Sequence, residues 1–151
     1  MHSLVRRYIK TAIGFLLAGL AIGGWMIVER ELVGRYPNPY EISAHTHAIF
    51  VGFVMMMIQG VALWLFPRPA RGDTRYRPAL AAAAYWLVAA GTAARVGGEL
   101  ARTAVAGAWL RWGVVASGFA QIAGLVLFFY TIWPRIRAVG SQVREANGER
   151  F

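Results

Sequence analysis

Four long apolar segments constrain the fold of this chain more than any other feature. They cover residues 11–28, 44–66, 79–98 and 108–133. A helix of roughly 20 apolar residues crosses a hydrocarbon core about 30 Å thick, and each segment is near that length. A transmembrane β-strand would alternate polar and apolar residues, which these segments do not do. The sequence therefore predicts an all-α fold, an integral membrane four-helix bundle.

The predicted bundle is a single transmembrane domain that takes in the whole chain, residues 1–151. Its helices are expected at about 7–28, 42–66, 79–98 and 104–133, with a polar C-terminal tail at 134–151. The composition favours lipid as the solvent, since 58% of the residues are hydrophobic and 15% are charged. Arg6, Arg7 and Lys10 precede the first segment, as in a cleaved signal peptide, but the segment is long and no small-residue cleavage site follows it. We therefore expect it to remain as the first helix.

Basic residues gather in segments that flank or join alternate helices. They precede the first helix, separate the second from the third and follow the fourth: Arg6, Arg7 and Lys10; Arg68, Arg71, Arg75 and Arg77; Arg135, Arg137, Arg144 and Arg150. In a chain of four spanning helices these segments share one side, and Lys and Arg are enriched on the cytoplasmic side. Both termini are therefore predicted to be cytoplasmic, in a bacterial inner membrane. The net charge of +9 then needs no nucleic-acid partner, and a basic patch for anionic lipid or nucleic acid is the alternative.

Two histidines, His45 and His47, open the second apolar segment. This topology places them near the periplasmic side. Ionisable groups within a membrane segment are costly, and their presence favours a functional role. Residues two apart on an α-helix point about 200° apart, so the two imidazoles cannot bind one ion unless the helix begins between them. The alternative is that they cap the helix or contact lipid headgroups at the interface.

The helical face that carries His45 also carries Gly52, Met56 and Gln59. The missing glycine side chain leaves room there for a flat ligand or for a close helix. An apolar slot beneath an imidazole suits haem, whose iron binds a neutral ring nitrogen. This face therefore predicts a haem-sized apolar slot beneath His45.

The two propionates of haem are anionic and are expected to pair with cationic side chains at the end of the site that faces water. Arg95 and Arg111 are expected at the level of the histidines, and an arginine can grip a carboxylate through two hydrogen bonds. Alternatively, Arg95 pairs with Glu99 one turn later, and Arg111 extends to the membrane interface.

The segment "HTHAIFVGFVMMMIQGVALWLFP" resembles the second transmembrane helix of subunit I of the haem-copper oxidase superfamily. It is similar in particular to that of the cbb-type oxidases and nitric oxide reductases. It resembles still more closely the short four-helix relatives of that subunit, whose second helix opens H-x-H and ends in a proline, and NnrS-like membrane proteins share some of its character. His45 and Thr46 match the family's H-T motif, and His47 stands where the family has Asn. The resemblance implies haem b near the external face, His45 as axial ligand and His47 as a second metal or haem contact. It also implies a redox, electron-transfer or nitric-oxide-related role.

The chain departs from that family in its supply of ligands. It has three histidines and no cysteine, too few for a low-spin haem, a high-spin haem and a copper ion together. It is therefore not a complete terminal oxidase on its own. The second axial position is left to His47, to a histidine of another copy in a homo-oligomer, to a small gas, or to nothing.

Two other functions remain open. Met55, Met56 and Met57 supply thioethers which, with an imidazole, suit Cu(I), so a copper-binding protein is one alternative. Flexible packing explains three consecutive methionines equally well. The other alternative is a non-haem structural or assembly subunit, in which the histidines only cap the second helix.

Overall fold

The computed structural model describes residues 3–67, 77–136, 143 and 147–148. Its elements are α1 (Ser3–Val28), η1 (Glu29–Val33), α2 (Pro39–Thr46), η2 (His47–Met55), α3 (Met56–Leu65), α4 (Pro78–Ala104), α5 (Ala108–Ile132) and η3 (Trp133–Arg135). Here η1 and η2 are π-helical and η3 is a 3₁₀ turn. The α2, η2 and α3 elements are continuous and form one helical rod, which we call the second rod because it is the second of the four membrane-length helices. Four helical stretches are long and apolar enough to cross a membrane, which confirms the predicted all-helical membrane fold.

The observed helices differ from the predicted ones mainly at their ends. The first begins at Ser3, and its π-helical turn carries it to Val33. The third continues through two glycines to Ala104, six residues past the predicted end. An ion pair at 3.1 Å between Arg95 and Glu99 spans those glycines and holds the turn together. Most of the predicted tail at 134–151 lies outside the described residues, as do Arg68, Arg71 and Arg75.

The second rod begins with a strong helix cap. The Asn38 side chain accepts a hydrogen bond from the Tyr40 amide at 3.0 Å, and the Glu41 carboxylate accepts one from the Asn38 amide at 2.7 Å. Pro39 occupies the first turn, where its fixed φ suits a helix. Arg35 hydrogen-bonds to Glu29 and to Glu41, and these bonds, the one to Glu29 foremost, raise the pKa of Arg35. The loop is thus tied to both helices that it joins.

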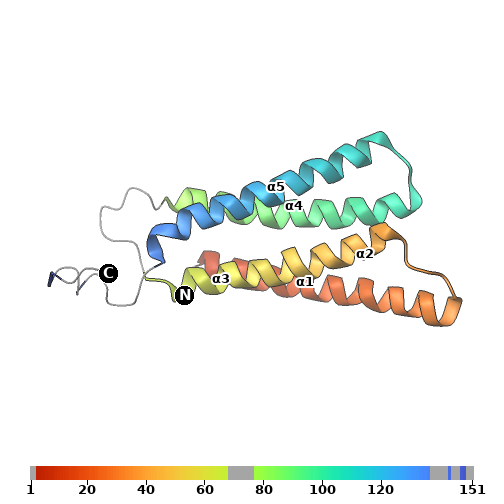
Figure 1. Cartoon of the computed structure of the whole chain (residues 1–151), viewed down its shortest axis with the longest axis horizontal. Helices are drawn as coiled ribbons and strands as arrows, with labels where there is room; N and C mark the ends of the chain where they lie inside the picture. Colours follow the sequence, from red (N-terminus) through yellow and green to blue (C-terminus); the bar gives the residue numbers. More distant parts are fainter. Residues whose placement is uncertain (1–2, 68–76, 137–142, 144–146, 149–151) are drawn as a thin grey trace.

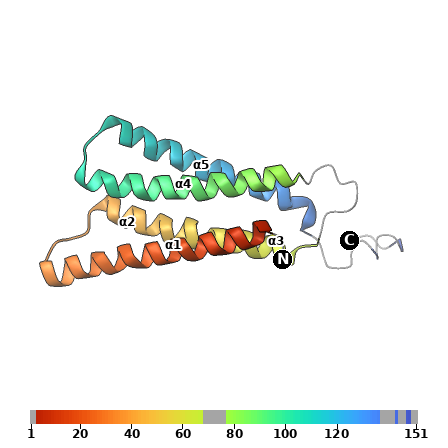
Figure 2. The same ribbon diagram turned by 180° about the vertical axis from the view of Figure 1, so that it is seen from behind.

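The helices are arranged as two layered hairpins (Figures 1 and 2). The α4 and α5 helices pack against each other along their length, α1 packs along the second rod, and α2 and η2 contact α4. We call the end that holds Ser3, Leu65, Pro78 and Ile132 the terminal end. The opposite end, with loops 34–38 and 105–107, we call the loop end.

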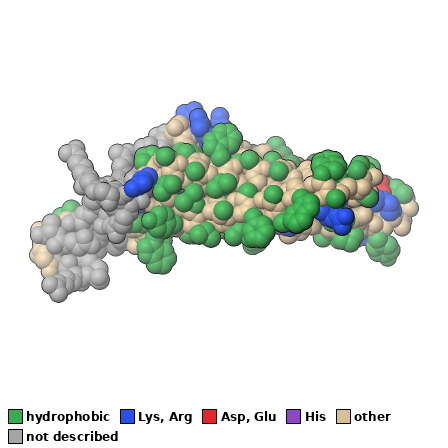
Figure 3. All heavy atoms as spheres, turned by 90° about the horizontal axis from the view of Figure 1, so that it is seen from above, with side chains coloured by type: hydrophobic (Ala, Val, Ile, Leu, Met, Phe, Trp, Pro, Cys, Tyr) green, Lys and Arg blue, Asp and Glu red, His purple; other side chains and the backbone are tan. Residues whose placement is uncertain are grey.

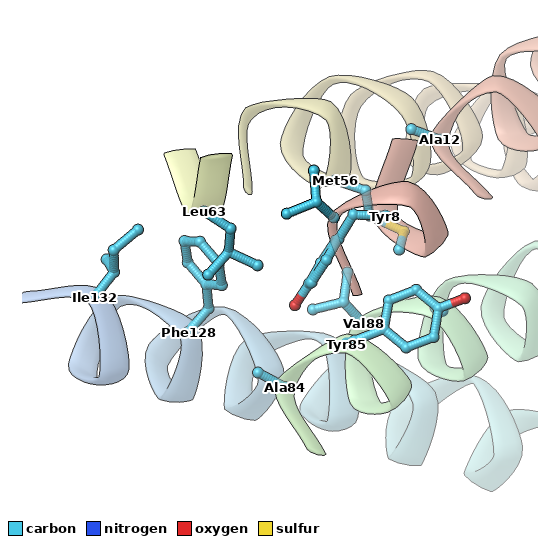
Figure 4. Packing of buried hydrophobic residues seen from close by; sticks show 11 residues of the cluster. Tyr8, Ala12, Met56, Leu63, Ala84, Tyr85, Val88, Phe128 and Ile132 are labelled. Atoms are coloured by element: carbon cyan, nitrogen blue, oxygen red, sulfur yellow. The ribbon is translucent and has the colours of Figure 1, made fainter. Parts of the chain in front are cut away.

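The main core lies toward the terminal end. Tyr8, Met56 and Phe128 are at most 1% exposed, and the Tyr8 ring lies 6.0 Å from that of Phe128 (Figure 4). The cluster at the loop end is smaller and is built on Ala44, Ala48 and Val96. Its small side chains let the helices approach one another closely.

The outer surface is as apolar as the core. Large side chains point outward along α1 and α5, among them Leu17 at 63%, Phe119 at 68% and Trp112 at 73% exposed. Figure 3 shows apolar side chains along the length of the molecule, with basic side chains toward its two ends. A water-soluble protein rarely exposes contiguous apolar surface on this scale. The surface therefore matches a lipid bilayer.

Candidate haem site beside His45

The second rod changes its helix type between the two histidines, since His45 lies in α2 and His47 begins η2. From His47 to Met55 the rod is π-helical, a wider turn whose characteristic hydrogen bond runs to the carbonyl five residues earlier. Buried residues recur at every fourth position, Ala44, Ala48, Gly52 and Met56. An ideal α-helix would rotate such a stripe steadily around its axis, whereas the wider turn keeps it in line. Single-turn π-bulges are frequent at functional sites, and this one is longer.

His45 is turned toward α1. Its Nδ1 lies 2.9 Å from the Gly19 carbonyl oxygen. A carbonyl oxygen can only accept, so Nδ1 donates and carries the ring proton. The Nε2 atom then holds the free lone pair, which is the form of imidazole that binds metal.

Gly23 makes room for this imidazole. A Cβ atom there would lie 2.9 Å from Cε1 of His45, closer than carbon atoms approach without a shift. Gly19 and Gly23 are one helical turn apart, so the carbonyl of the first and the missing side chain of the second act on the same ring. The pair therefore serves the imidazole as well as the packing of two helices.

A groove of about 660 Å³ opens beside His45 at the loop end. Its lining comes from the last turns of α1, the loop that follows and the first turns of α2: Leu20, Gly23, Gly24, Met26, Ile27, Arg30, Tyr36, Pro37, Ile42 and His45. The volume falls within the range of roughly 300–1,000 Å³ typical of small-molecule and cofactor sites. Apolar groups dominate, and Arg30 is the only cation among them. The groove therefore combines a nitrogen ligand, apolar walls and one positive charge.

His47 lies on the other side of the rod and faces α4. Its Nδ1 is 2.8 Å from the Ser43 carbonyl oxygen and 3.7 Å from Oε2 of Glu99. Glu99 is 2% exposed, and its Oε1 accepts hydrogen bonds from Ser43 at 2.8 Å and from Arg95 at 3.1 Å. The predicted divergence of the two histidines and the predicted pairing of Arg95 with Glu99 are both confirmed.

The other predicted site residues do not border the groove. A Cβ at Gly52 would collide with the Phe15 ring, so of the two predicted uses of this space, a flat ligand or a close helix, the structure has the close helix. Met56 and Gln59 are fully buried deeper in the rod. The Gln59 amide atoms have no hydrogen-bond partner among the described residues.

The two arginines predicted for the propionates also lie elsewhere. Arg95 is held by Glu99, and its guanidinium lies against Gly118 of α5. Arg111 is exposed on α5. Neither borders the groove, whereas Arg30 does. The predicted topology places these arginines at the level of the histidines along the helices. Which side chains meet also depends on the side of each helix from which they project.

The groove residues that were not predicted from the sequence come mainly from α1 and from η1, which continues it. Gly23, Met26 and Arg30 follow Gly19 at helical spacing, so they continue the face that contacts the second rod. The glycine pair in α1 was the available signal, since it lies at the same depth as His45.

The donor set fits haem. Among the described residues, no group of three or more His, Cys, Asp or Glu side chains is placed to hold a bare metal ion. Haem brings four nitrogen ligands of its own and needs only an axial ligand from the protein. A free Nε2 beside an apolar groove, with a cation at its edge, meets that need.

Fold and groove together define a multi-pass helical membrane protein with an imidazole ligand exposed to an apolar groove. The family model described as Cytochrome C and Quinol oxidase polypeptide I matches residues 3–146. The chain therefore belongs to this family, that of haem-copper oxidase subunit I, as the resemblance of its second helix implied. Members typically bind haem and copper. No curated protein and no solved structure matches the chain.

The role of Gly23 can be tested by one added methyl group. We expect Gly23→Ala to push the imidazole off the Gly19 carbonyl and to weaken haem binding by about 10- to 100-fold, the usual cost of losing such a supporting hydrogen bond. Haem titration of the apoprotein measures this. Gly14→Ala on the same helix is the matched control, because a Cβ there meets nothing within 4 Å and Gly14 does not line the groove. Equal affinities of the two variants would contradict the role.

Proposed function

We propose that this chain is a haem b-binding membrane protein with a redox, electron-transfer or nitric-oxide-related role, in which Nε2 of His45 is the axial ligand. The observation that carries the proposal is the hydrogen bond from Nδ1 of His45 to the Gly19 carbonyl, which leaves Nε2 free beside the groove. Membership of a haem-binding family supports it. The test is the haem content of His45→Ala, which is developed in the Discussion.

Each part of the groove has a physical task in this proposal. The Gly19 carbonyl fixes the tautomer of His45 and makes Nε2 a better donor. Arg30, now paired with Glu31 at 2.7 Å on the surface, can exchange that partner for a propionate. The apolar walls suit the apolar macrocycle. Haem iron, when bound, supplies one-electron chemistry.

The proposal includes an orientation of the chain in the membrane. The terminal end faces the cytoplasm of a bacterial cell and the loop end faces the periplasm. The described basic residues at the terminal end support this orientation: Arg6, Arg7, Lys10, Arg77 and Arg135.

The groove is open to its surroundings, and a second copy in a homo-oligomer can cover it. A copper-binding protein and a structural subunit remain the alternatives, and metal analysis separates them from a haem protein.

The orientation can be tested because the chain contains no cysteine. Ser3 at the terminal end and Ala106 at the loop end are both exposed, so each can be replaced by a single cysteine without disturbing the core. We expect a membrane-impermeant maleimide to label Ala106→Cys in intact spheroplasts and Ser3→Cys only after lysis. The reverse pattern would overturn the proposed orientation.

A further inference from the structure

The groove beside His45 offers a second metal ligand. We propose that Met26 supplies its thioether sulfur as the second axial ligand of the haem iron; this rests on the function proposed above. His45 and Met26 come from different helices, α2 and α1, and both line the groove.

The contacts of α1 place Met26 on the face that meets the second rod. Two contacts mark this face of α1: Tyr8 lies against Gly60 of α3, where a Cβ would be 3.0 Å away, and Gly23 lies against His45 of α2. Met26 follows Gly23 by three residues, which is about 4.5 Å of helix rise and close to one full turn. It therefore lies on the same face of α1, one turn nearer the loop end than the residue that cradles the imidazole.

The other polar groups near the groove suit the position less well. Arg30 is a cation and has no lone pair to donate. Tyr36 is 83% exposed, so its hydroxyl group is free to point to water. His47 faces α4 and is held at Ser43. Met26 is half-buried, uncharged and soft, which matches both the apolar lining and the iron.

A histidine and a methionine together would set the properties of the site. A thioether ligand raises the reduction potential of a haem, because it favours the ferrous iron. If His45 and Met26 both held the iron, they would leave no open position for a small gas. The inferred site is thus suited to hold an electron rather than to bind a gas freely.

The test compares Met26→Leu with wild type, using the full chain in detergent. Leucine keeps the volume and apolar character but removes the donor, so the variant is expected to fold and to retain haem. We expect its ferrous haem to become five-coordinate and high-spin, its carbon monoxide affinity to rise at least tenfold and its midpoint potential to fall. Met26→His should restore a six-coordinate spectrum. Met57→Leu is the matched control, because it removes the same thioether from α3, away from the groove, and its spectrum should match that of wild type.

The outcomes separate this inference from the proposed function. A haem-loaded Met26→Leu with an unchanged spectrum and carbon monoxide affinity overturns the role of Met26 alone. A wild-type protein that holds haem in the five-coordinate, high-spin state overturns it as well, and leaves His45 as the sole ligand. A wild-type protein that takes up no haem overturns both proposals.

Discussion

Replacing His45 by alanine is expected to reduce the haem content of the purified protein by more than about tenfold, because the replacement removes the iron ligand itself. His45 is the only histidine that lines the groove in the described part of the chain. The Soret absorbance per mole of protein measures the effect. Folding is monitored by helical circular dichroism, which should be unchanged because the imidazole is only partly buried.

His47→Ala is the matched control for this experiment. It removes the same side chain two residues later, on the side of the rod that faces α4. Its haem content should stay close to that of wild type. Loss of haem in His47→Ala with retention in His45→Ala would reverse the assignment and move the site to the Glu99 side.

Replacing Glu99 by methionine is expected to destabilise the protein by about 3 kcal/mol, the lower end of the cost of breaking a buried ion pair. Glu99 is 2% exposed and bridges two helices through Ser43 of α2 and Arg95 of α4. Its loss leaves the Arg95 guanidinium without a counter-ion. A quarter of the Arg95 side chain is exposed, which lets solvent reduce the cost. For a chain of this length the melting temperature in detergent should fall on the order of 10 °C.

Two further variants isolate the cause of this loss. Arg95→Met combined with Glu99→Met removes both charges, and the double variant should be more stable than Glu99→Met alone. Glu31→Met breaks the ion pair with Arg30, whose side chains are more than half exposed, and should change stability by less than about 1 kcal/mol. A double variant no more stable than the single one would show that the charge of Arg95 is not the cause.

Hydropathy predicted the four helices correctly because lipid leaves a spanning backbone few choices. Every amide and carbonyl in the hydrocarbon must be paired within the segment, so a long apolar run becomes a helix. The ends were less certain, since they depend on individual contacts. The ion pair of Glu99 with Arg95 extends α4 past two glycines, and the Asn38 cap fixes the start of α2. Neither effect appears in a hydropathy profile.

The candidate site was predictable only in part. The spacing of His45 and His47 correctly predicted that they diverge, because two residues cover about 200° on a helix. The face below His45 was not predictable, since the π-helical stretch changes the turn angle and Phe15 of α1 fills the space at Gly52. Arg30 was overlooked because depth in the membrane is visible in the sequence, whereas the rotation of α1 about its axis is not.

The ligands beside His45 bear on how many metal centres the described part of the chain can hold. The groove has one imidazole, one thioether and one cation, and the second histidine of the rod is engaged with α4. These groups suit a single haem better than a haem paired with a copper ion. In the function proposed above, they would hold one haem.

The most direct test is the oxidised and dithionite-reduced visible spectrum of the detergent-purified wild-type protein, with haem and metal content measured on the same sample. We predict a Soret band, sharpened visible bands on reduction and about one haem per chain, extractable by acidified solvent because the chain has no cysteine to attach it. A colourless, iron-free preparation, from cells supplied with haem, would contradict the account. Stoichiometric copper in that preparation would point to a copper protein, and no metal at all to a structural subunit.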